Sequence, residues 1–228
     1  MDAQFPRVYK SPTELVGRTP LLRLGNLFPD ATVLGKLEFF NPAGSVKDRT
    51  ALSIVRAAEA DGRLKPGGTI IETTGPEIWE DTGGRVDVLV STVGTGGTIT
   101  GAGSYLREKN PDLRIYAVEP AEAPVLSGGQ FTPHKIQGII GGNGFPPVLD
   151  TALYDEVVTI SSDVAIETSR ELMRAEGLFA GVSAGANIAR IVAGRPEHAG
   201  QTIVTFLCDT GERYVSSELF DHARETSE

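Results

Sequence analysis

The sequence predicts an α/β fold in three layers, with a parallel β-sheet between two layers of helices. Two observations predict it. Short apolar runs rich in β-branched residues recur along the chain, and amphipathic stretches of helical period separate them. Continuous apolar runs are typical of strands buried on both sides, so both faces of the sheet are expected to be covered.

The strands are expected where these apolar runs occur. They cover residues 33–37, 69–72, 86–92, 114–118, 156–160 and 202–207. The helices are expected between them, at about 46–60, from Thr98 onward, at about 163–176 with an end at Gly177, and from near Ala184. In the first helix one face is apolar, formed by Ala51, Ile54, Val55 and Ala58, and Asp61-Gly62 supplies its end.

The stretch 121–150 has no clear periodicity and is rich in glycine and proline. Loops of this length in a compact domain are usually functional. A plain surface excursion is the alternative, and the sequence leaves both open.

Composition excludes several classes of protein. Of the 228 residues, 40% are hydrophobic and 22% charged, as in ordinary globular proteins, and the formal net charge of -9 argues against nucleic-acid binding. No apolar run approaches the roughly 20 residues that span a bilayer, so no membrane association is expected and the protein is predicted to be cytoplasmic. One cysteine and three scattered histidines exclude a disulfide framework and make a metal site unexpected.

A glycine-rich turn links an expected strand to an expected helix. The sequence STVGTGGT, residues 91–98, follows the run VDVLV directly. Gly94, Gly96 and Gly97 allow a close approach of the backbone, and the start of the following helix attracts anions. The turn is suited to hold a phosphate, although a tight strand-to-helix connection explains it equally well by itself.

Lys47 lies in the first turn of an expected helix, within NPAGSVKDR, with Ser45 as the expected N-cap. Cations are disfavoured at this end of a helix, so the position suggests a role other than stability. The helix field, together with burial, favours the neutral amine that a Schiff-base nucleophile requires. The ordinary alternative is a lysine that extends into solvent.

Ser183 is the third candidate, in the small-residue turn GVSAGAN. Its hydroxyl either caps the following helix or exchanges a hydrogen bond with a heteroaromatic ring nitrogen. The sequence does not separate these two roles.

Taken together, these segments resemble the cysteine synthase (O-acetylserine sulfhydrylase) family of fold type II pyridoxal-phosphate (PLP) enzymes. The segments that match, in order, are VGRTPLLRL, KLEFFNPAGSVKDR, TTGPEIWEDTGG, VGTGGTITG, AVEP, PHKIQG, GVSAGA and GERYVSS. The resemblance covers nearly the whole chain and implies a tryptophan synthase β-like fold. It implies three parts: residues 1–34 packing on the large domain, residues 35–74 as a remnant of the small domain, and residues 75–228 as the large PLP-binding domain.

The resemblance also implies roles for individual residues. Lys47 would carry the cofactor and act as the base, and Ser183 would meet the pyridine nitrogen. The phosphate would be held by Gly94, Thr95, Gly96, Gly97 and Thr98. Gln137 and Gly138 would border the substrate. The implied reaction replaces the acetoxy group of O-acetylserine with sulfide to give cysteine and acetate. The implied partners are a second copy of the chain and the C-terminal tail of serine acetyltransferase.

An internal segment is missing compared with this family. After residues 69–72 the family continues with a Ser-Gly-Asn-Thr-Gly loop, which binds the substrate carboxylate, and with a mobile subdomain. Here Glu72-Thr73 continues directly into Thr74. Three origins are compatible with this junction: a deliberate deletion, a natural shortened paralogue, or a segment of the protein that the sequence omits.

Two alternatives to cysteine synthase follow. One is a related PLP enzyme, namely an O-phosphoserine sulfhydrylase, a cystathionine β-synthase or a serine/threonine dehydratase. The other is a truncated, non-catalytic remnant of the fold, on which the loss of the subdomain would expose apolar surface.

Overall fold

The computed structural model describes residues 9–61, 74–140, 145–188 and 190–221. In these residues a six-stranded sheet has the order β1-β2-β6-β3-β4-β5. The strands are β1 Leu21–Arg23, β2 Thr32–Leu37, β3 Val88–Thr92, β4 Arg114–Pro120, β5 Glu156–Ile160 and β6 Thr202–Leu207. All neighbouring pairs are parallel except β1 with β2, which is antiparallel. The predicted fold class is therefore confirmed.

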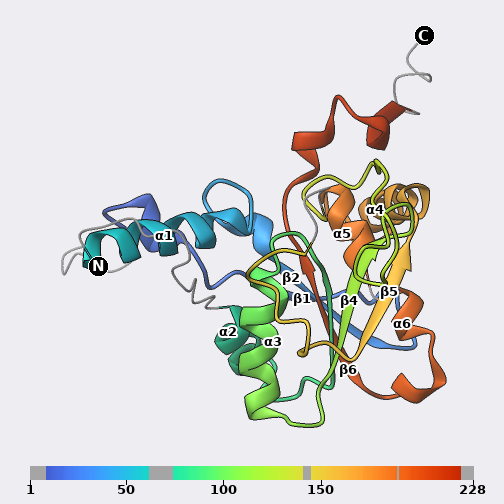
Figure 1. Ribbon diagram of the computed structural model, residues 1–228, viewed down its shortest axis with the longest axis horizontal. Helices are drawn as coiled ribbons and strands as arrows, with labels where there is room; N and C mark the ends of the chain where they lie inside the picture. Colours follow the sequence, from blue (N-terminus) through green and yellow to red (C-terminus); the bar gives the residue numbers. More distant parts are fainter. Residues whose placement is uncertain (1–8, 62–73, 141–144, 189, 222–228) are drawn as a thin grey trace.

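Helices cover both faces of this sheet (Figure 1). The α-helices of the described residues are α1 Lys47–Asp61, α2 Thr74–Asp81, α3 Gly97–Lys109, α4 Ser162–Glu176, α5 Val182–Asn187 and α6 Arg190–Ala193. Short 3-10 helices complete the described residues: η1 Pro12–Leu15, η2 Glu38–Phe40, η3 Pro196–His198, η4 Gly211–Tyr214 and η5 Glu218–Phe220. No helix in the described ranges is long and apolar enough to cross a membrane.

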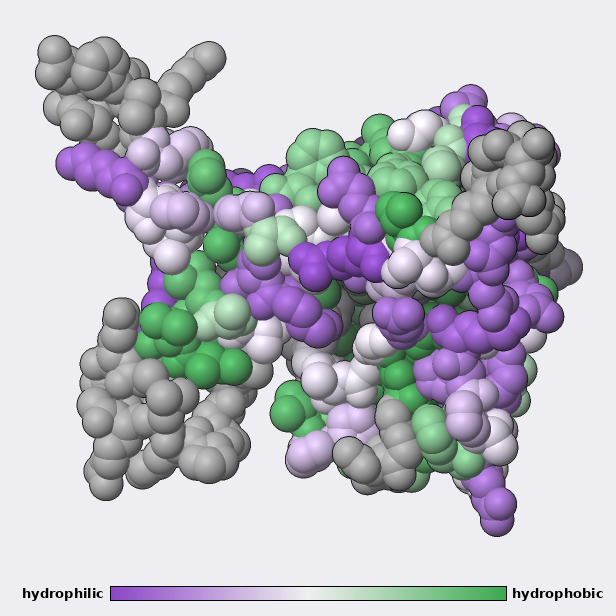
Figure 2. Space-filling model, turned by 90° about the horizontal axis from the view of Figure 1, so that it is seen from above, coloured by the Kyte–Doolittle hydropathy of each residue, from purple (hydrophilic) through white to green (hydrophobic). Residues whose placement is uncertain are grey.

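Helix α1 projects away from the sheet (Figure 1), and the arm that contains it carries hydrophobic surface (Figure 2). Ala51 is exposed on this helix, and Ile54 and Val55 are 42% and 52% exposed. These are three of the four residues that the sequence places on one apolar face. The face exists as predicted, and it lies open because no described element packs over it.

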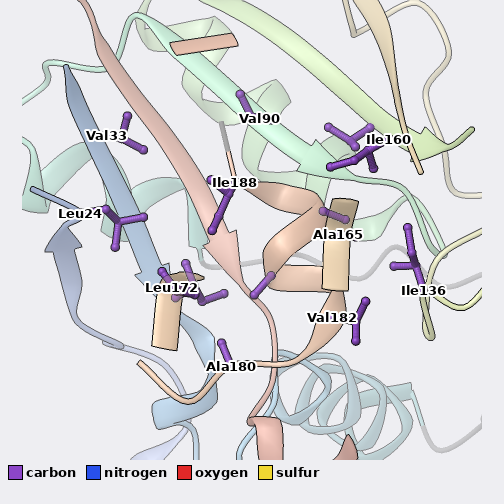
Figure 3. Packing of buried hydrophobic residues seen from close by; sticks show 14 of the residues in the cluster. Leu24, Val33, Val90, Ile136, Ile160, Ala165, Leu172, Ala180, Val182 and Ile188 are labelled. Atoms are coloured by element: carbon purple, nitrogen blue, oxygen red, sulfur yellow. The ribbon is translucent and has the colours of Figure 1, made fainter. Parts of the chain in front are cut away.

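The core has two halves, one on each side of the sheet. The larger half includes Val88 and Val90 of β3 and packs against α4, α5 and α6 (Figure 3). The smaller half includes Leu89 of the same strand and packs against α2 and α3. Because alternate residues of a strand point to opposite faces, one continuous apolar run supplies both halves.

Most element predictions agree with the structure, and several differ. The strand expected at 69–72 lies outside the described residues. The sequence did not predict β1 or α2. β1 is an edge strand of only three residues, and α2 begins with Thr-Gly-Pro, a sequence that is typical of turns. The helix expected from near Ala184 begins at Val182 and ends at Asn187, before α6.

Helix α4 shows how closely local signals can locate an element. Ser161 is its N-cap and accepts a hydrogen bond from the N–H of Val164, and Gly177 ends it in the left-handed conformation. The sequence placed this end at Gly177.

Candidate active site

A cavity of about 160 Å³ opens at the carboxyl ends of the parallel strands. Every candidate residue from the sequence lines it, namely Lys47, Gly94, Thr95, Gly96, Gly97, Thr98, Gln137, Gly138 and Ser183. These residues come from four separate segments of the chain. Ligands of α/β proteins bind at this edge of the sheet, where the loops after the strands meet.

The glycine-rich turn connects β3 to α3. Gly96 is the N-cap of α3 and has φ +83°, in the left-handed region that favours glycine. No side chain caps the helix. The first N–H groups of α3 therefore remain available to an anion in the cavity.

The same turn is enclosed by the loop 121–150. A Cβ at Gly96 would lie 2.7 Å from the Cβ of Leu149, and a Cβ at Gly94 would collide with the carbonyl oxygen of Gly138. The N–H of Ile140 donates to the carbonyl of Val93 at 2.9 Å. The described part of the loop is thus one wall of the cavity, which favours the functional interpretation over a surface excursion; residues 141–144 lie outside the described residues.

Lys47 is the first residue of α1, so it lies in the first turn of the helix, as the sequence predicted. The hydroxyl of Ser45 accepts a hydrogen bond from the Lys47 N–H at 3.2 Å, and Asp48 accepts one from the Ala43 N–H at 2.6 Å. Lys47 itself is exposed. The expected burial of Lys47 is therefore wrong, although Arg49, two residues further along the same turn, is buried.

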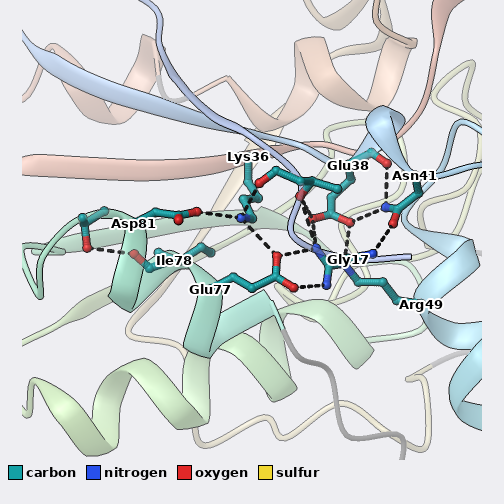
Figure 4. A network of polar contacts seen from close by, with 10 residues as sticks. Gly17, Lys36, Glu38, Asn41, Arg49, Glu77, Ile78 and Asp81 are labelled. Carbon is teal, nitrogen blue, oxygen red and sulfur yellow. Dashed lines mark hydrogen bonds and ion pairs between the residues drawn. The ribbon is translucent and has the colours of Figure 1, made fainter. Parts of the chain in front are cut away.

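A buried ionic network fixes the start of α1 (Figure 4). Arg49 donates from Nε to Glu38 Oε2 at 2.7 Å and from its two terminal nitrogens to Glu77 at 2.7 and 2.8 Å. Lys36 of β2 contacts Glu77 at 3.2 Å and Asp81 at 2.9 Å. The network joins β2, α1 and α2 two residues from Lys47.

This network holds Glu77 in its ionised form. Burial alone would raise the pKa of Glu77, but hydrogen bonds from Arg49 and from the N–H of Arg18 outweigh it and lower the pKa to about 2. Burial alone would likewise lower the pKa of Arg49, and the hydrogen bonds to Glu77 and Glu38 raise it instead. Removing one partner of such a buried ion pair strongly destabilises a protein, because the other charge is left buried without compensation.

Ser183 is buried in the second position of α5, and Gly181 is the N-cap of this helix without a side-chain cap. Ser183 therefore does not cap α5, which was one of the two roles that the sequence left open. Asn187, at the end of α5, accepts a hydrogen bond from the N–H of Thr92 and donates to Cys208 at 3.3 Å. These contacts fix α5 against the strand that leads into the glycine-rich turn.

Sequence reasoning missed the contribution of the segment after β6. Cys208, Asp209 and Arg213 also line the cavity. Oδ2 of Asp209 accepts a hydrogen bond from the Tyr214 hydroxyl at 2.8 Å, and the buried Oδ1 has no hydrogen-bond partner among the described residues. Burial raises the pKa of Asp209 against the opposing effect of the Tyr214 hydrogen bond. Their position in the sequence could have identified them, because they follow the buried parallel strand β6 as Gly94 follows β3.

Comparison with known proteins decides the family. A family model described as "Pyridoxal-phosphate dependent enzyme" matches residues 12–74 and 71–209. The chain belongs to this family. It is therefore a PLP-dependent enzyme by descent, as the resemblance implied.

Cysteine synthases are among the relatives of this PLP-dependent enzyme. It is 32% identical over 299 residues to a cysteine synthase of Staphylococcus aureus, with 91% of this chain and 96% of the relative covered. It also resembles the crystal structure of a cysteine synthase from Entamoeba histolytica, with a TM-score of 0.86, 30% identity, and 96% and 93% of the two chains covered. The structure of an O-ureido-L-serine synthase is similar too, with a TM-score of 0.85, 32% identity, and coverage of 96% and 99%.

These comparisons also agree with the missing internal segment. The alignment with the S. aureus relative extends over 299 positions and includes 91% of the 228 residues of this chain, about 207, so about 92 positions (299 minus 207) have no counterpart here. The two matched segments of the family model meet at residues 71–74. This is the junction at which the sequence departs from its relatives.

The residues around the cavity fit PLP. The uncapped start of α3 suits its phosphate, and the open space beside Gly97, where an added Cβ would meet only Thr95 Oγ1 within 4 Å, leaves room for it. The amine of Lys47 suits its aldehyde, and Ser183, which does not cap its helix, suits its ring nitrogen. Groups that complement three parts of one cofactor thus line one cavity.

Proposed function

We propose that this PLP-dependent enzyme is a cysteine synthase, which replaces the acetoxy group of O-acetylserine with sulfide. The observation that carries the proposal is the convergence of Lys47, the turn Gly94–Thr98 and Ser183 on one cavity. The names of the relatives support the reaction type.

When bound, PLP supplies an electron sink for the negative charge that forms at the substrate Cα. The side chains divide the remaining work. The Lys47 amine binds the cofactor aldehyde and, once released, removes the proton from Cα. The N–H groups at the start of α3, with Thr95 and Thr98, bind the phosphate.

Ser183 is proposed to hydrogen-bond the ring nitrogen. A neutral hydroxyl does not enforce a protonated ring, as a carboxylate would, so it limits charge delocalisation and favours elimination over transamination. Gln137 and Gly138, at the exposed rim of the cavity, are proposed to border the substrate.

The test is to incubate the purified chain with PLP and to record its spectrum before and after borohydride reduction. A band near ~410 nm and a reduced adduct on Lys47 are expected, together with cysteine formation from O-acetylserine and sulfide. Lys47→Ala should lose the band and the adduct, and Lys109→Ala, another exposed lysine, should keep both. A wild-type chain without band or adduct would refute the proposal.

A related PLP enzyme remains the first alternative. O-phosphoserine sulfhydrylase, cystathionine β-synthase and serine/threonine dehydratase use the same cofactor chemistry on other substrates. Product analysis with O-acetylserine, O-phosphoserine and serine separates them, and equal or better use of O-phosphoserine would exclude the acetylserine assignment.

We further propose that residues 35–74 are what remains of a small domain, with residues 1–34 packing on the large domain of residues 75–228. The break of the family match at 71–74 and the open face of α1 support this division. An intact mass of 24.2 kDa would establish a shortened protein, whereas a larger mass would indicate a segment that the sequence omits. A shortened protein without a cofactor band would be the non-catalytic remnant.

The proposed setting is the cytoplasm, and the proposed partners are a second copy of the chain and the C-terminal tail of serine acetyltransferase. Sedimentation and a peptide pull-down test the two partners. A monomer that does not retain the peptide would exclude both.

A further inference from the structure

Few charged side chains line the cavity. Among the described residues that do so, the charged ones are Lys47, Asp209 and Arg213. The proposed function commits Lys47 to the cofactor, and Asp209 is engaged with Tyr214. Arg213 is then the remaining cation. An amino-acid substrate carries a carboxylate, which needs a cation or several hydrogen-bond donors when it leaves water.

Arg213 is held at the rim of the cavity. It lies in η4, and one of its terminal nitrogens donates to the carbonyl oxygen of Ala43 at 2.6 Å. Ala43 precedes Lys47 in the same loop, so this bond places the guanidinium beside the segment that carries the reactive lysine.

The backbone around Arg213 is fixed on both sides. The N–H of Gly211 donates to the carbonyl of Phe179 at 2.9 Å, and the hydroxyl of Thr210 accepts from the N–H of Glu212. Tyr214 is buried and bonded to Asp209. The guanidinium is therefore presented from a rigid turn, which limits the entropy lost when a ligand binds.

The guanidinium keeps unused donors. It has five N–H groups, and within the described ranges its one hydrogen bond is to Ala43 and no carboxylate lies within ion-pair distance of it. The residue is exposed at the rim. Its positive charge also acts on groups inside the protein. Burial raises the pKa of Asp209 and of Tyr214, and the charge of Arg213 opposes both increases.

We propose that Arg213 binds the α-carboxylate of the amino-acid substrate and so selects α-amino acids over simple amines. The inference rests on the proposed function, since it assumes that the substrate amine is directed to the cofactor beside Lys47. A carboxylate that accepts from the remaining N–H groups of Arg213 orients the amino acid between the rim and the lysine. Arg213 is thus a specificity-determining residue of the cavity.

The test uses two ligands that differ in the carboxylate alone, L-serine and ethanolamine. Each is titrated into the PLP-loaded chain, and the concentration that half-changes the cofactor band is measured. In Arg213→Gln the affinity for L-serine should fall by ~10-fold or more, as for loss of a charged hydrogen bond, and the affinity for ethanolamine should stay within ~2-fold. Arg213→Lys should recover part of the loss, and Arg85→Gln, an exposed arginine outside the cavity, should match the wild type.

Other results would overturn the inference in distinct ways. An equal loss of affinity for both ligands would mean that Arg213 supports the structure of the cavity without binding the carboxylate. No change in either would mean that it does not touch the substrate. The same titration is repeated with O-phosphoserine and O-acetylserine, and a loss of affinity confined to O-phosphoserine would assign Arg213 to a phosphate instead. If the wild type shows no cofactor band, the proposed function fails as well. If the wild type shows a normal band and Arg213→Gln leaves the affinity for L-serine unchanged, only this inference is refuted.

Discussion

The guanidinium of Arg49 and the carboxylate of Glu77 form two parallel hydrogen bonds, at 2.7 and 2.8 Å. This pair joins the start of α1 to α2 although the segment 62–73 lies between the two helices in the chain. The exposed apolar face of α1 does not hold the helix in place, so the ionic network and the buried Val46 fix the turn that carries Lys47.

Arg49→Met should therefore destabilise the protein by about 3 kcal/mol, because it leaves buried carboxylates without their partner. Urea unfolding followed by circular dichroism measures this difference. Arg174→Met is the matched control, since Arg174 pairs with Glu167 at an exposed site, where an ion pair contributes at most about 1 kcal/mol. Equal effects of the two substitutions would show that the network adds no special stability.

Acid should weaken the fold through Glu77. Its pKa is lowered from 4.5 to about 2, so the ionised carboxylate contributes stability above about pH 4.5, and this contribution is lost as the pH falls through about 2. The shift corresponds to about 3 kcal/mol. Urea midpoints at several values between pH 5 and 2 should fall less steeply in Glu77→Gln than in the wild type. The exposed Glu108→Gln serves as the control and should follow the wild type.

Gly96→Ala should impair both folding and cofactor binding. The residue has φ +83°, and the new Cβ would lie 2.7 Å from Leu149 Cβ. Gly128→Ala has nearly the same φ, +84°, with nothing within 4 Å of the new Cβ, and so isolates the backbone strain. Gly96→Ala should be less stable than Gly128→Ala by about 1–3 kcal/mol and should bind PLP more weakly in a fluorescence titration. Indistinguishable variants would contradict the close packing of this turn.

Polar substitution on the open face of α1 should improve solution behaviour at little cost in stability. Ile54→Glu with Val55→Lys removes exposed apolar surface, and substitutions at exposed positions typically change stability by less than about 0.5 kcal/mol each. Light scattering and binding of an apolar dye should both decrease. A large loss of stability instead would show that this face is covered in solution.

The sequence alone determined the fold class, the strands from β2 to β6 that fall on described residues, and nine of the residues that line the cavity, but not Cys208, Asp209 and Arg213. Local signals suffice for these features. β-branched apolar runs predict strands, Gly177 ends α4, and Gly94 and Gly96 mark a turn after a buried strand. The ordered set of motifs added the family and the position of the missing segment.

The tertiary structure alone decided which groups meet across long stretches of chain. It paired β1 with β2, joined Arg49 to Glu77, and placed Arg213 against Ala43, 170 residues away in sequence. It also left Lys47 and the apolar face of α1 exposed, although their local patterns allow burial. The physical reason is that periodicity records the preference of a residue for apolar surroundings or a conformation, whereas burial and pairing depend on what the rest of the chain brings beside it.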